Sequence, residues 1–138
     1  MESTRRIAQK DKIQPTQTNQ LNVLKVDKDC FVDRAWIDAY IEVIMQICSN
    51  HDLTVRVIKM CNSKKKGLHF YILVSPAIDS ELANMIQWLL GDDCRRVDFN
   101  RARIESGLTE WNKLFEVPMR RLKTIYKEPR SVLRVHAE

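Results

Sequence analysis

Three aspartates, a histidine and several cations are the residues of this chain whose types and spacing suit chemistry on nucleic acid or nucleotides. Asp27 and Asp29 stand two positions apart after a short apolar run, Asp98 lies in a second one, and His69 follows a glycine and three consecutive lysines. Each also has an ordinary interpretation. An aspartate at a strand end caps a loop or helix, a lone histidine is a half-buried side chain, and a lysine run is a solvated turn.

The elements that must position these residues are indicated by apolar periodicity and by capping residues. In chain order they are a strand at 21–26, a helix capped by Asp33 that ends near Asn50, strands at 54–61 and 68–75 joined by the turn 62–67, a helix from Asp79 or Ser80 to Gly91, and a fourth strand at 95–99. The order βαββαβ predicts a ferredoxin-like or RRM-like α+β fold, a two-layer sandwich with both helices on one face of the sheet.

Strand order and side-chain parity predict where the candidate residues meet. In this fold the first and third strands are central and the fourth borders the first, so their ends carry Asp27, Asp29, His69 and Asp98 to one end of the sheet. Alternate residues of a strand point to opposite faces. The face away from the helices should therefore hold Lys25, Asp27, Asp29, His69, Tyr71, Arg96 and Asp98.

Three short motifs between residues 21 and 100 give the chain a resemblance to the archaeo-eukaryotic primase superfamily, the primase-polymerases with an RRM-like catalytic core. The motifs are Leu24-Lys25-Val26-Asp27-Lys28-Asp29, Gly67-Leu68-His69 and Val97-Asp98, in the family's order. The chain departs from the family pattern at Lys25, where an apolar residue is usual, and at Gly67, where serine is usual. It is also short for a complete primase, so it resembles a minimal, inactive or repurposed core, of a kind expected in a virus or plasmid.

The resemblance implies metal-dependent nucleotidyl transfer on DNA or RNA. Asp27, Asp29 and Asp98 would be the catalytic carboxylates and would bind Mg²⁺ or Mn²⁺, ions that prefer such oxygen-rich sites. His69 would contact the phosphates of a nucleoside triphosphate. Further positive charge for that nucleotide would come from Lys64, Lys65, Lys66, Arg95 and Arg96.

Two other classes of function stay open. A non-catalytic RRM-like domain would bind single-stranded nucleic acid, although the expected sheet face is acidic and Tyr71 is its one aromatic residue. A structural or protein-interaction module would use Trp36, Trp88 and Trp111 as core. A rolling-circle nuclease is disfavoured, because the paired metal-binding histidines of that class are absent.

Composition places the chain among globular proteins, and its start lacks the apolar stretch of a signal peptide, so we expect an intracellular, cytoplasmic location. We divide it into an N-terminal arm at 1–20, a domain at 21–117 and a basic extension at 118–138; the net charge of +5 resides at the two ends. No apolar run is long enough for a membrane span. Cys30, Cys48, Cys61 and Cys94 are scattered singly, which favours free thiols and leaves a disulfide as the alternative.

Overall fold

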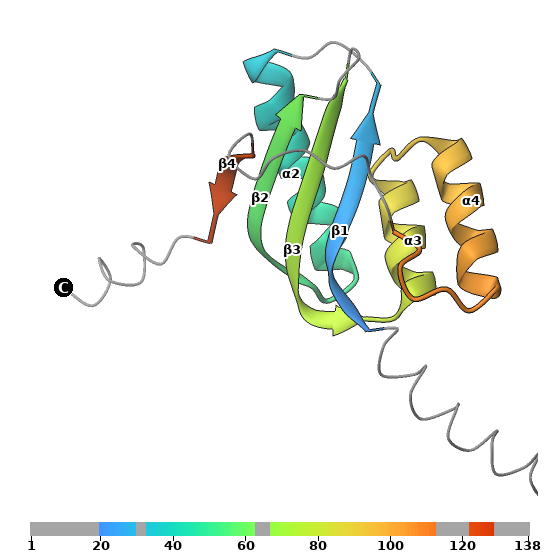
Figure 1. Cartoon of the computed structure of the whole chain (residues 1–138). Helices are drawn as coiled ribbons and strands as arrows, with labels where there is room; N and C mark the ends of the chain where they lie inside the picture. Colours follow the sequence, from blue (N-terminus) through green and yellow to red (C-terminus); the bar gives the residue numbers. More distant parts are fainter. Residues whose placement is uncertain (1–19, 30–32, 63–66, 113–121, 129–138) are drawn as a thin grey trace, which may run out of the picture.

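The computed structural model describes residues 20–29, 33–62, 67–112 and 122–128, and Figure 1 shows their arrangement. Nearly all of the predicted N-terminal arm and much of the predicted C-terminal extension therefore lie outside the described residues. The elements are β1 (Leu21–Lys28), α2 (Arg34–Asn50), β2 (Thr54–Asn62), β3 (Leu68–Ile78), α3 (Ser80–Leu89), α4 (Cys94–Glu105) and β4 (Lys123–Lys127). The predicted α+β class is confirmed.

The four strands form one antiparallel sheet in the order β1-β3-β2-β4. Helix α2 crosses one face of this sheet, and α3 and α4 lie beyond the β1 edge (Figure 1). The predicted ferredoxin-like order is wrong at the fourth strand. That strand is formed by residues 123–127 and pairs with β2, whereas residues 95–99 belong to α4.

Helix α4 forms where a strand was predicted because its buried positions have a helical spacing. Val97 and Asn100 are buried three residues apart, while Phe99, which strand parity would bury with Val97, is 61% exposed. Asp93 begins the helix, since its side chain accepts a hydrogen bond from the Arg95 N–H. An aspartate in this position satisfies one of the unpaired N–H groups of the first turn.

Both helix starts that were predicted are confirmed. The Asp33 carboxylate accepts the Trp36 N–H at 2.9 Å, and the Asp79 carboxylate accepts the Leu82 N–H at 2.8 Å. These caps fix the residues at which α2 and α3 begin.

The core lies between the sheet and the helices α2 and α3, and Ala83 and Ile86 of α3 are fully buried in it. Tyr40 stacks on Trp36, with ring centroids 4.8 Å apart, and meets the edge of Phe70 at 5.0 Å. Leu24, Ile58 and Ile72 are fully buried beneath the helices. The predicted parity of β1 and β3 is therefore confirmed for the apolar residues.

The exposed edge of β1 is closed by side chains. The N–H of Lys25 donates to Oε1 of Gln87, and the N–H of Asp27 donates to Oδ1 of Asp92, both at 2.9 Å. Backbone N–H groups two residues apart in a strand point to the same side, and both of these point away from β3. Side chains from α3 and from the α3–α4 turn thus occupy the position where the fourth strand was expected.

Two expectations about cysteines and membranes can be compared with the described residues. Cys48, Cys61 and Cys94 are free thiols, the first two buried, and Cys30 lies outside the described part. In that same part, the helices lack the length and apolar character needed to cross a bilayer.

Candidate functional site

Asp27 and His69 meet at one end of the sheet, as the sequence predicted. They are directly opposite each other in the β1–β3 register, and Nε2 of His69 lies 3.6 Å from Oδ1 of Asp27. Because the Asp27 N–H points outward to Asp92, this is a non-hydrogen-bonded pair. In such a pair the Cα atoms are about 4.5 Å apart and the side chains are closest.

His69 is buried, although the sequence placed it on an open surface. Its side chain is 3% exposed, and its Nδ1 has no hydrogen-bond partner in the described structure. Burial lowers the pKa of His69, and the charge of Asp27 opposes that shift. Burial also raises the pKa of Asp27, with His69 and Arg96 opposing. Neutral imidazole is therefore the favoured form of His69 at pH 7.

Asp92 is the carboxylate that the sequence analysis missed. Its Oδ1 accepts the N–H groups of Asp27 and Asp93, and its Oδ2 accepts Nη1 of Arg96 at 2.9 Å. Burial raises the pKa of Asp92 to about 6, against the lowering effect of Arg96. The spacing of four residues between an acid and an arginine was the available signal for this pair.

The Arg96 side chain is held within the fold by hydrogen bonds, and the residue lies on α4 instead of on the predicted strand. Its guanidinium donates to Asp92 and, through Nη2, to Oδ1 of Asn112 at 2.9 Å. Its side chain is only 10% exposed. The predicted contact of Arg96 with a nucleotide needs an accessible guanidinium, and in this structure the guanidinium is buried.

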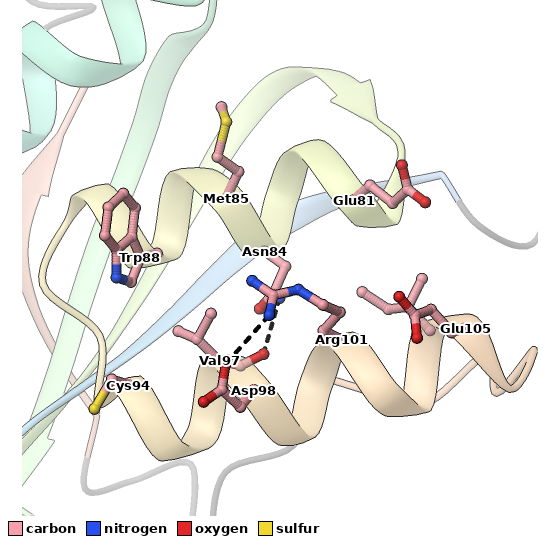
Figure 2. Close-up of a pocket in the computed structure, with 10 residues that line it drawn as sticks. Glu81, Asn84, Met85, Trp88, Cys94, Val97, Asp98, Arg101 and Glu105 are labelled. Carbon is pink, nitrogen blue, oxygen red and sulfur yellow. Dashed lines mark hydrogen bonds and ion pairs between the residues drawn. The ribbon is translucent and has the colours of Figure 1, made fainter.

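Asp98 does not join Asp27. It lies on α4 two residues after Arg96, about 200° around the helix, so the two side chains leave on nearly opposite sides. The Asp98 side chain is 72% exposed, pairs with Arg101 at 3.3 Å and lines a groove between α3 and α4 (Figure 2).

The predicted three-carboxylate metal site therefore lacks its third member. Asp29 is exposed directly after β1, and Asp92, the carboxylate bonded to Asp27, already uses both oxygens within the fold. Across the described ranges, three or more histidine, cysteine or acidic side chains are nowhere grouped so as to hold a metal ion. We therefore derive no catalytic step through Mg²⁺ or Mn²⁺.

The remaining predicted cations are only partly described. Lys64, Lys65 and Lys66 lie outside the described residues. Arg95 is exposed on α4 and lies 3.7 Å from the Asp93 carboxylate.

A second row of side chains crosses the sheet next to the Asp27–His69 pair. Lys25, Tyr71 and Lys59 are aligned in register across β1, β3 and β2, on the face opposite α2. All three are half-buried, and the Lys25 ammonium donates to the Asn112 carbonyl at 2.9 Å. We call these three residues the Lys-Tyr-Lys row. Lys25 and Tyr71 were expected on this face among acidic residues, and the structure adds Lys59 on the other side of the ring.

A scan against protein-family models and searches of curated proteins and of solved structures find no match to this chain.

Proposed function

We propose that this protein binds single-stranded nucleic acid on the sheet face opposite α2, as RRM-like domains do. The observation that carries the proposal is the Lys-Tyr-Lys row, in which Lys59 stands beside Tyr71 in the strand register and Lys25, on the other side of the ring, is held by the Asn112 carbonyl. Proteins that bind single strands combine cations along the phosphate backbone with aromatic rings on which bases stack. Strands lie about 4.8 Å apart, so the two lysine positions are about 10 Å apart and bracket the ring.

The Asp27–His69 pair borders this surface in the proposed binding mode. A neutral His69 adds no positive charge, and the partly exposed Asp27 carboxylate repels phosphates. Together they confine a bound strand to the Lys-Tyr-Lys row. In this proposal, Asp27 and His69 thus form one edge of the nucleic-acid-binding surface.

Binding is favoured over catalysis because Asp98, the third predicted carboxylate, lies on α4 and pairs with Arg101. Kinship with a non-catalytic primase-polymerase core is compatible with the Asp27–His69 pairing, and we include it in the proposal. Metal-dependent nucleotidyl transfer and contact between His69 and a nucleoside triphosphate stay predictions from the resemblance.

The proposal is tested by fluorescence anisotropy with labelled 20-nucleotide DNA and RNA strands at several salt concentrations. We expect Lys59→Gln to weaken binding severalfold and to reduce the slope of log K against log salt by about 0.7, the value for one phosphate contact on a single strand. Tyr71→Leu should cost about 1–3 kcal/mol of binding free energy, and Tyr71→Phe should retain most of it.

Lys123→Gln is the matched control. Lys123 is exposed on β4 and pairs in register with Met60, which packs against the core on the α2 side. Equal effects of Lys59→Gln and Lys123→Gln would refute binding on the proposed face. Primer extension with Mn²⁺ that is lost in Asp29→Ala would instead restore the catalytic alternative.

A further inference from the structure

A groove of about 450 Å³ runs between α3 and α4, on the side of β1 away from the rest of the sheet (Figure 2). Its floor is held in place by buried amides. The Asn84 side chain donates to the Val97 carbonyl at 3.1 Å, and the Asn100 side chain donates to Oδ1 of Asn84 at 3.2 Å. These contacts tie the two helices together, so the groove is formed before any partner arrives.

One side of the groove is apolar and faces solvent. Met85 and Trp88 line it, and with Leu89 they form an exposed stripe at spacings of three and four residues along α3. Trp88 is 56% exposed, which is unusual for the largest apolar side chain. Exposed apolar clusters with polar borders are typical of interaction sites.

The border of the groove is acidic, in a protein of net charge +5. Three carboxylates, Glu81, Asp98 and Glu105, line it against one guanidinium, Arg101, which pairs with Asp98. Glu81 and Glu105 lie at the same end of the helix pair, opposite the Trp88 end (Figure 2). Within the described residues, neither has a cation at ion-pair distance.

We propose that this groove binds an amphipathic helix of a partner protein whose basic residues meet Glu81 and Glu105 while its apolar residues cover Trp88. Two antiparallel helices of 10 and 12 residues offer about 15–18 Å of groove, the length of three helical turns. Helix-in-groove recognition uses apolar anchors at spacings of three, four and seven residues. This site is separate from the Lys-Tyr-Lys row and extends beyond nucleic-acid binding.

Charge excludes the two other obvious occupants. A symmetric contact between two copies, with the two-fold axis through the middle of the groove, would place Glu81 and Glu105 against the apolar Trp88 end of the second copy, where these carboxylates would lose water without gaining a cation. An anionic membrane would be repelled by the same acidic border. A cationic helix complements both the charge and the apolar stripe.

The test uses the full chain and two labelled synthetic helical peptides. The first carries leucines at spacings of three, four and seven residues with two arginines at one end, and the second has glutamates in place of the arginines. We expect saturable anisotropy with the basic peptide at 150 mM salt and at least tenfold weaker binding of the acidic peptide. Trp88→Ala and Glu105→Lys should each weaken binding of the basic peptide at least fivefold.

Phe99→Ala is the matched control, because Phe99 is an exposed aromatic residue of α4 that does not line the groove. Circular dichroism and nucleic-acid binding should be unchanged in Trp88→Ala, since that side chain is 56% exposed and the contact of α3 with Lys25 is made by Gln87. The proposal is overturned if the basic peptide does not bind, if both peptides bind equally, or if Phe99→Ala weakens binding as much as Trp88→Ala. Sedimentation showing a dimer that Trp88→Ala dissociates would also overturn it, in favour of a second copy.

Discussion

At the scale of single residues, the end of β1 gathers two coupled pairs, Asp27 with His69 and Asp92 with Arg96. They are connected through the Asp27 N–H, which donates to the Asp92 carboxylate. The sequence predicted the first pair because both residues lie on strands whose register follows from apolar alternation. It could not predict the second, because Asp92 and Arg96 approach β1 through a turn and a helix whose placement depends on tertiary packing.

A pH dependence of stability follows from Asp92. Its pKa is raised from 3.8 to about 6, so the folded protein holds this proton more tightly than the unfolded chain does. The stabilising contribution is present below pH 4 and is lost as the pH rises through 6. Carboxyl NMR should give a titration midpoint near 6 for Asp92. Urea unfolding at several pH values measures the free energy of unfolding, and its loss as the pH rises through 6 should be absent in Asp92→Asn.

Arg96→Gln supplies the complementary measurement. Removing the guanidinium removes the charge that lowers the pKa of Asp92, so the NMR midpoint should move upward. A midpoint near 4 in the parent chain, or a downward shift in Arg96→Gln, would contradict this assignment.

At the scale of elements, β1, α2, the β2–β3 hairpin and α3 were predictable because each combines a clear period with a cap or a turn. Residues 95–99 were misassigned because Val97 and Phe99 fit a period of two over a window too short to show the burial of Asn100. The true fourth strand, residues 123–127, was included in a basic extension. Its lysines concealed the strand-forming Thr-Ile-Tyr sequence between them.

Loss of the α4 cap tests the corrected assignment. Asp93→Ala should reduce the free energy of unfolding by about 1 kcal/mol, because the Arg95 N–H loses its acceptor, while Asp93→Ser should retain most of it. Urea denaturation followed by circular dichroism measures both variants. Equal losses in the two variants would show that Asp93 does not act as a cap.

At the scale of the whole molecule, charge is distributed unevenly. Residues 1–20 carry four basic residues against two acidic ones, and residues 118–138 carry six against two, while the α3–α4 groove is acidic. The strand order was beyond sequence reasoning, because the choice of partner for β4 depends on tertiary packing and not on a local pattern of residues.

The basic ends should add sequence-independent attraction to the proposed nucleic-acid surface. Replacing Arg5 and Arg6 together by glutamine should weaken binding equally for all strands and lower the salt slope by about 1.4, if each arginine meets one phosphate. Arg34→Gln, on exposed α2, is the control and should leave the slope unchanged. A change in sequence preference in the double variant would contradict a purely electrostatic role.

The closure of β1 by Gln87 and Asp92 limits how copies of this protein can join by strand pairing. Two N–H donors on that border are already engaged, so an incoming strand would have to displace both side chains before it could bond there. Within the described residues the other border of the sheet is β4, so we expect any strand pairing between copies to begin there. Endless cross-β stacking needs two receptive borders on every molecule, and the closure of β1 removes one of the two borders of the described sheet.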